Sequence, residues 1–243
     1  MIKSSVGMQL KVRTGVVLVG GAGLRMRPLT EDVPKPMIKL RGKPILHWTL
    51  DWLKKYAFKH IVLGVAYRRD MVIDYIRKNQ FGLDIDFSTH TVEGGTGEGF
   101  RLAIERYVDD ENFLAMNGDE LTNLNLNNMI NFHLKSQPVG TVAVSPMRSP
   151  FGIVQISKNN IIGFEEKPIL EDRLVSIGIY IFNHRIIDYL PAKGALEKTT
   201  FPSLALLEQL KAYKLSRDER WMTINTVKDL SAAEEEFELI RRL

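Results

Sequence analysis

Short apolar runs alternate with amphipathic stretches along the first half of the chain. Four apolar runs predict buried strands, at residues 15–20, 60–67, 83–88 and 112–119. Three stretches between them place apolar residues at helical spacing and predict helices, at residues 43–58, 68–79 and 100–108. Strands separated by helices of this length are typical of βαβ units and a mainly parallel sheet.

The second half carries its apolar residues mainly in strands, which we expect at 140–147, 151–168 and 174–183. Within the middle one, Ser-Lys-Asn-Asn at 157–160 predicts a hairpin turn. Residues 220–243 predict a short strand and a closing helix. We therefore expect an α/β fold with a Rossmann-like doubly wound, mainly parallel (mixed) central sheet and a small β-rich lobe, although strand order does not follow from the pattern.

Composition and charge narrow the class of protein. The 243 residues are 44% apolar and 26% charged, as in ordinary globular domains. The 33 basic and 29 acidic residues give a net charge of +4 without a long run of one sign. This mild excess is a poor signature of nucleic-acid binding and suits a small polyanionic substrate equally well.

Cysteine content and hydropathy exclude further classes of protein and of site. The chain has no cysteine, which excludes disulfides, thiolate catalysis and cysteine–zinc sites. Its first residues lack the apolar core of a signal peptide, and no apolar run approaches the roughly 18–20 residues that span a bilayer. We therefore expect a cytoplasmic protein that binds neither membrane nor nucleic acid.

A glycine-rich loop follows the first predicted strand. Gly20, Gly21 and Gly23 lack Cβ atoms, so backbone N–H groups there can face a phosphate. Arg25 and Lys35 follow on a segment that three prolines keep from running straight into a helix (Pro28, Pro34 and Pro36). The pattern predicts that this segment curls back over the glycine turn, although a solvated basic loop explains the spacing equally well.

Two common phosphate-binding fingerprints do not fit this loop. The dinucleotide fingerprint needs a third glycine where Met26 stands, which disfavours a dinucleotide-dependent oxidoreductase. The Walker pattern needs serine or threonine after Gly42-Lys43, but Pro44 stands there.

The full string Gly-Gly-x-Gly-x-Arg-Met-x-Pro-Leu-Thr, followed by Pro-Lys-Pro-Met, resembles the signature of the sugar-1-phosphate nucleotidyltransferases, or NDP-sugar pyrophosphorylases. Five further segments resemble this family in its own order: VEGGTGEG, FLAMNGDEL, FGIVQI with IIGFEEKP, SIGIYIFN and WMTINTVKDL. The resemblance covers about residues 16–230. It implies one nucleotidyltransferase domain over 1–243, of the short single-domain branch. A nucleotide-binding half would span about 15–120, and a sugar-phosphate-binding half about 121–230, with the closing helix to 243.

The resemblance also implies an activity and a site. The activity is Mg²⁺-dependent transfer of a nucleoside monophosphate from an NTP to a sugar 1-phosphate, which yields an NDP-sugar and pyrophosphate. The implied catalytic residues are Arg25 and Lys35, and the implied metal ligands are Asp119 and Asn225. The implied nucleotide-binding residues are Gly20, Gly21, Gly23, Glu93, Gly95 and Thr96. The implied sugar-phosphate-binding residues are Gly152, Glu166, Lys167 and Gly178.

The chemistry of this reaction agrees with those residue types. The attacking phosphate oxygen is already anionic near neutral pH, so no general base is required. The difficulty lies in bringing two anions together and stabilising the leaving pyrophosphate, which calls for positioning, cations and magnesium. The five histidines are scattered along the chain, and we assign them no role.

Several positions depart from the family pattern and leave the substrate open. Leu24 stands where a hydroxyl residue is usual, Asn225 where a second metal-binding aspartate is common, and Val227 where a proline is common. Glu98 stands where the base loop keeps a small residue, either to read a base donor or to face solvent, and Ser176 replaces a residue that often contacts the sugar.

Three functions remain to be compared. We prefer a guanylyltransferase acting on a mannose- or heptose-type 1-phosphate, because the Glu-then-Gly-Thr-Gly pattern resembles the short guanylyltransferases. The first alternative is a cytidylyltransferase acting on phosphocholine or inositol phosphate. The second is a non-catalytic regulatory subunit that binds a nucleotide sugar, against which Arg25, Lys35 and Asp119 argue. A homo-oligomer is possible in each case.

Overall fold

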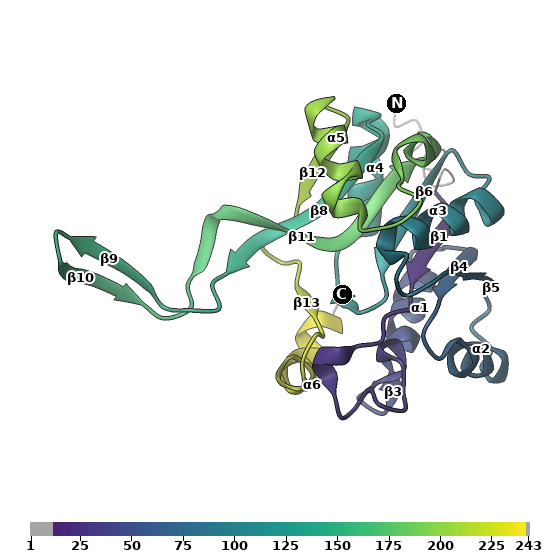
Figure 1. The fold of residues 1–243 in the computed structure, drawn as a ribbon, viewed down its shortest axis with the longest axis horizontal. Coiled ribbons are helices and arrows are strands. Elements are labelled where there is room, and N and C mark those ends of the chain that lie inside the picture. Colours follow the sequence, from purple (N-terminus) through teal and green to yellow (C-terminus); the bar gives the residue numbers. More distant parts are fainter. Residues whose placement is uncertain (1–11, 242–243) are drawn as a thin grey trace, which may run out of the picture.

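A seven-stranded sheet forms the centre of the computed structural model, which describes residues 12–241 (Figure 1). The strand order is β12-β8-β11-β6-β1-β4-β5. The strands are β1 (Thr14–Leu18), β4 (His60–Val65), β5 (Asp84–Thr89), β6 (Asn112–Asn117), β8 (Gly140–Arg148), β11 (Ile169–Asn183) and β12 (Leu210–Lys214). Only β11 runs antiparallel to its neighbours β8 and β6 in this sheet, and the other pairs are parallel. The predicted mixed, mainly parallel doubly wound sheet is confirmed.

Helices cover both faces of the sheet. One apolar core packs α1 (Ile45–Lys55), α2 (Arg69–Lys78) and α4 (Leu126–Ser136) on one face, and a second packs α3 (Gly95–Tyr107) and α5 (Thr200–Leu206) on the other. Successive strand residues point to opposite faces, so Val16 belongs to one core and its neighbour Val17 to the other. Burial on both faces explains why the strands read as continuous apolar runs.

A smaller unit packs beside the carboxyl ends of the strands. It pairs β7 (Glu120–Thr122) with β13 (Trp221–Thr223), and β2 (Lys39–Leu40) with β3 (Lys43–Pro44). The closing helix α6 (Val227–Arg241) packs here through Phe237, whose ring lies 4.8 Å from that of Trp48. Residues from the end of the chain are thereby brought back to the end of β6.

A β-hairpin arm projects from the body of the molecule (Figure 1). Its tip pairs β9 (Ile153–Ser157) with β10 (Asn160–Glu165), which confirms the predicted turn at 157–160. Its base is the paired outer parts of β8 and β11. The β-rich part expected in the second half thus consists of strands of the central sheet and this arm, which we define as residues 145–175.

The structure differs from the predicted elements in two respects. Helix α3 begins at Gly95, so most of the predicted glycine-rich loop at 93–99 forms its first turns. Helices α4 and α5 and the edge strand β12 were not predicted. Helix α5 is short and contains Pro202, β12 has only five residues, and the helical spacing of Leu126, Met129 and Ile130 in α4 was a signal that the prediction did not use. Contacts with the rest of the fold stabilise these elements, although the local sequence pattern does not predict them.

His133 on α4 provides a structural pH probe. Its side chain is buried, its Nδ1 lies 2.8 Å from Thr141 Oγ1, and its Nε2 lies 3.0 Å from Asn112 Oδ1. Burial, and secondarily the charge of Arg185, lower the pKa of His133 to about 4. The unfolded chain therefore binds the proton more readily than the folded one, with an ordinary pKa near 6.5.

We expect the contribution of His133 to stability to be complete above about pH 6.5 and to fall as the pH drops toward 4. Between pH 7.5 and 5 the loss should be about 2 kcal/mol in the free energy of unfolding. Urea denaturation at the two pH values measures it, with His133→Gln as the non-titrating comparison. An equal pH dependence in both proteins would contradict this account.

Candidate active site

A cavity of about 250 Å³ opens at the carboxyl ends of β1 and β6. The chain builds β1, β4 and β5 outward in one direction, and α3 then crosses back before β6 forms on the other side of β1. The cavity thus lies at a topological switch point, where open α/β sheets bind ligands. Six of the predicted site residues line it: Gly20, Gly21, Lys35, Gly95, Thr96 and Asp119.

Four side chains meet at the edge of this cavity. The Lys35 ammonium donates to the Asp119 carboxylate and also to Asn225 Oδ1, at 2.8 Å from the latter. Arg25 Nη2 donates to the same amide oxygen at 2.8 Å. The structure therefore joins the predicted catalytic pair to the predicted metal ligands, although about 200 residues of sequence separate Arg25 from Asn225.

The loop geometry explains how Lys35 reaches the site. Gly23 has φ +62, and a Cβ there would lie 2.9 Å from Thr30 Cγ2 and 3.0 Å from Lys35 Cβ. Thr30 Oγ1 also donates to the Gly23 carbonyl at 2.7 Å. The segment thus folds back on the glycine turn as predicted, with short 3₁₀ helices at Leu24–Met26 and Lys35–Met37. Leu24 is 64% exposed.

The orientation of the Asn225 amide is fixed by its surroundings. Its Nδ2 donates to Thr223 Oγ1 at 2.9 Å, which turns Oδ1 toward Arg25 and Lys35. The backbone N–H groups of Asn225 and Thr226 donate to Asp229 Oδ2 at 3.0 and 2.8 Å, a cap on the entry to α6. Helix α6 therefore holds the amide in place from outside the cavity.

Glu120 is a site residue that sequence reasoning missed. Its side chain is buried beside Asp119, and Trp221 Nε1 donates to its Oε2 at 2.7 Å. Burial, and then the charge of Asp119, raise the pKa of Glu120 well above its ordinary value. Gly178 has φ +72, and a Cβ there would lie 2.9 Å from Glu120 Oε1, so this predicted sugar-side glycine does border the site. Two adjacent acidic residues after a buried strand were the available signal.

Polar contacts hold residues 91–98, the segment that the family resemblance places beside the nucleobase. Glu98, which departs from the family pattern, accepts hydrogen bonds from the Thr91 hydroxyl at 2.7 Å and the Thr91 N–H at 2.8 Å. These bonds lower the pKa of Glu98. Thr96 Oγ1 donates to Glu197 Oε2 at 2.9 Å, whereas the predicted Glu93 is exposed and does not line the cavity. Glu98 thus fastens the segment that precedes α3.

Gly95 cannot be replaced without strain. It has φ +67, and a Cβ there would lie 2.8 Å from the carbonyl oxygen of Gly194. We expect Gly95→Ala to lower the free energy of unfolding by about 2 kcal/mol, the usual scale for a non-glycine residue in a strained conformation. Gly21→Ala is the matched control, because a Cβ there meets nothing within 4 Å. Equal losses in the two variants, measured by urea denaturation, would contradict this assignment.

The remaining predicted sugar-phosphate residues lie on the arm. Gly152 precedes β9, and Glu166 and Lys167 follow β10. Lys167 Nζ lies 3.2 Å from Glu166 Oε1, and both side chains are about half exposed. Figure 1 shows this arm directed away from the body, so the structure does not bring these three residues to the cavity.

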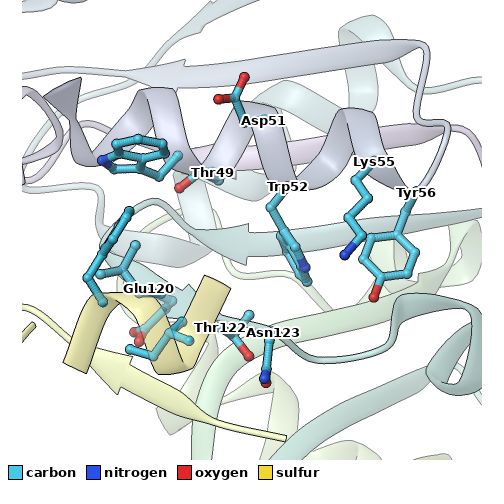
Figure 2. A pocket seen from close by; sticks show the side chains of 12 residues that line it. Thr49, Asp51, Trp52, Lys55, Tyr56, Glu120, Thr122 and Asn123 are labelled. Atoms are coloured by element: carbon cyan, nitrogen blue, oxygen red, sulfur yellow. The ribbon is translucent and has the colours of Figure 1, made fainter. Parts of the chain in front are cut away.

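A second pocket, of about 180 Å³, lies between α1, β7 and α6. Figure 2 shows Trp52 of α1 pointing toward Thr122 of β7 across it. Among its lining residues Lys55 stands against two acidic residues, Asp51 and Glu120. That lining does not favour a polyanionic ligand, so the cavity at β1 and β6 remains the candidate site.

The oxygen atoms of Asp119 and Asn225 converge on one cationic group, the ammonium of Lys35. Such hard oxygen donors suit a divalent ion that completes its coordination with substrate phosphates. Within residues 12–241, no group of three or more His, Cys, Asp or Glu side chains is placed to hold a metal ion by itself. No helix in the described part of the chain is both long enough and apolar enough to cross a membrane.

Comparison with known proteins places these features in context. Residues 14–238 match the family model described as "Nucleotidyl transferase". The chain is 32% identical over 224 residues to mannose-1-phosphate guanyltransferase of Yarrowia lipolytica, covering 88% of this chain and 61% of the relative. It is 32% identical over 222 residues to the mannose-1-phosphate guanylyltransferase catalytic subunit beta of Dictyostelium discoideum, with the same coverage. It thus spans about three fifths of the length of these relatives.

A solved structure gives a consistent picture. HddC from Yersinia pseudotuberculosis, complexed with GMP-PN, is similar in fold with a TM-score of 0.72 and 25% sequence identity. The match covers 93% of this chain and 100% of that one.

Proposed function

Because the chain belongs to the nucleotidyl transferase family, we propose that it transfers a nucleoside monophosphate from an NTP to a sugar 1-phosphate and releases pyrophosphate. The observation that carries this proposal is the cluster of Arg25, Lys35, Asp119 and Asn225 at the edge of the switch-point cavity. We also propose that the matched region acts as one nucleotidyltransferase domain. A cytoplasmic location stays a prediction.

The proposed reaction is a direct displacement at phosphorus. A phosphate oxygen of the sugar 1-phosphate forms a bond to the α-phosphorus, and the bond from that phosphorus to the bridging oxygen breaks. The electron pair leaves with pyrophosphate. Arg25, with its planar guanidinium, binds the triphosphate oxygens, and Lys35 adds a charge where negative charge accumulates on the leaving group.

Backbone and metal complete the proposed arrangement. Gly20 and Gly21 let N–H groups approach the triphosphate closely. Asp119 and Asn225 are the residues that would hold Mg²⁺, and their oxygen donors fit it. When bound, the ion neutralises phosphate charge and orients the triphosphate. One carboxylate and one neutral amide make this a weaker metal site than two carboxylates would.

We propose GTP as the nucleotide and a mannose- or heptose-type 1-phosphate as the acceptor. The names of the relatives from Yarrowia and Dictyostelium support the guanylyl and mannose parts of this proposal. The HddC structure complexed with GMP-PN supports a guanine nucleotide.

The experiment that tests the proposed function combines the four common NTPs with several sugar 1-phosphates and phosphocholine, each with Mg²⁺, and measures pyrophosphate release. We expect the highest kcat/KM with GTP and a mannose- or heptose-type 1-phosphate. Highest turnover with CTP and phosphocholine would replace the proposed substrates. Tight nucleotide-sugar binding without turnover for any pair would contradict the proposed activity and favour a regulatory subunit.

A further inference from the structure

The arm has one apolar face that the described chain leaves uncovered. In the register of β9 and β10, Ile156 pairs with Ile161 and Val154 pairs with Phe164, so these four side chains share one face. They are 45–67% exposed. The opposite face is mainly polar, with Ser157 paired to Asn160 and Ile153 to Glu165.

We expect a hairpin with one exposed apolar face to pack against another surface. Strands with one apolar face are ordinarily half-buried, and an isolated two-stranded hairpin is at best marginally stable in water. Nine of the seventeen large exposed hydrophobic side chains of the described chain belong to the arm. Contiguous exposed apolar surface of this sort marks an interaction site.

The cavity at β1 and β6 lacks positive charge for a second anionic substrate. Two anionic substrates meet there, but Lys35 is the only lysine or arginine among the described residues that line it, and burial lowers the pKa of His90. Arg25 and Lys35 serve the triphosphate, which leaves the phosphate of the acceptor without a cation. Lys167 is a cation of the arm, half exposed beside Glu166, and its backbone is held in the left-handed region with φ +48.

The geometry also argues against the arm folding onto its own body. Strands β8 and β11 leave the central sheet together and pair again as far as Arg148 and Ile169, with register shifts between Leu170 and Leu174 and between Ser176 and Tyr180. The Ser149 N–H donates to the Pro168 carbonyl at 2.9 Å and closes the base of the tip hairpin. The arm is therefore a paired extension of the sheet and not a loose loop. It projects away from the body (Figure 1), and none of its residues lines the cavity.

We propose that the arm docks on a second copy of this chain and completes that copy's active site, with Lys167 binding the acceptor phosphate there. The proposal rests on the proposed function for the role of Lys167. In a dimer with two-fold symmetry each copy gives its arm and receives the other, so both apolar faces are covered and both sites are completed.

Sedimentation velocity on the full chain tests the docking independently of catalysis. We expect a dimer of about twice the chain mass of 27.7 kDa. Ile156→Asp combined with Ile161→Asp should shift it to monomer without loss of the folded body, which circular dichroism and GTP binding check. Leu206→Asp is the matched control, because Leu206 is 87% exposed on α5 outside the arm. A monomeric wild-type protein, or a dimer that the double variant leaves intact, would overturn the proposal.

Complementation tests whether the site is shared. Lys35→Ala (body) and Lys167→Ala (arm) are co-expressed with different affinity tags, and the heterodimer is isolated by tandem purification. If the arm acts on the other copy, one site of each heterodimer is intact and about half of the wild-type activity per dimer returns. If the arm acts on its own body, both sites are defective, and near-zero activity would overturn the sharing of the site.

A second heterodimer and the wild-type dimer complete the experiment. Lys35→Ala paired with Asp119→Ala should remain inactive, since both changes lie in the body. If the wild-type dimer itself turned over no NTP and acceptor pair, the proposed function would fail, while the sedimentation results would still decide the docking.

Discussion

Asp119→Ala is expected to lower the rate of pyrophosphate release by about 10²–10³-fold, the scale on which loss of one preorganised electrostatic group acts. Asp119 follows Gly118 at the carboxyl end of β6, and its carboxylate accepts from Lys35 at the edge of the cavity. Removing it takes away the one charged oxygen ligand in the proposed metal pair. The rate should fall at every Mg²⁺ concentration.

Asp119→Asn tests the effect of the negative charge of the side chain separately from that of its shape. It retains an oxygen donor but loses the negative charge, so we expect partial activity that requires more Mg²⁺ for half of the maximal rate. Asp109→Ala is the matched control, because Asp109 is an exposed aspartate beyond the opposite end of β6. Turnover by Asp119→Ala near that of Asp109→Ala would exclude Asp119 from the site.

Lys35→Ala should reduce pyrophosphate release by a similar ~10²–10³-fold, because the leaving group loses a buried positive charge. Lys35 is 8% exposed, and its ammonium bonds to both Asp119 and Asn225. Loss of these charge-assisted bonds should also lower the free energy of unfolding by about 2 kcal/mol.

Lys39→Ala provides the comparison for this variant. Lys39 is an exposed lysine on the same segment, so its loss should change neither rate nor stability beyond about 0.5 kcal/mol. Steady-state kinetics and urea denaturation on both variants give the two readouts. A Lys35→Ala protein that lost stability but kept wild-type kcat would show a structural lysine and contradict the assignment.

The positions of some site residues could be predicted from the sequence, because they depend on residues close to them in the chain. Gly23 adopts a left-handed conformation, and the neighbouring prolines keep the loop short of a long helix, so the return of Lys35 over the glycine turn was predictable. The place of Asp119 at the ligand-binding edge of the sheet was predictable, because it follows a buried strand and the carboxyl ends of such strands meet at one edge.

Other parts depend on contacts between distant segments. The bond between Arg25 and Asn225 exists because α6 packs back against the body. Family resemblance implied a role for each residue but no contact between them. The burial of Glu120 depends on Trp221, about 100 residues away. The direction of the arm follows from how far β8 and β11 stay paired, which alternation of apolar and polar residues does not specify.

We expect the cavity at β1 and β6 to transfer a nucleoside monophosphate from an NTP to a sugar 1-phosphate with the help of a divalent ion. The most direct test measures pyrophosphate release from GTP, mannose 1-phosphate and Mg²⁺ together, and with each of the three omitted in turn. We predict release in the complete mixture, at least 10²-fold less when any component is missing, and the same low rate for Asp119→Ala in the complete mixture. Equal release without the sugar phosphate, or undiminished release by Asp119→Ala, would contradict the account.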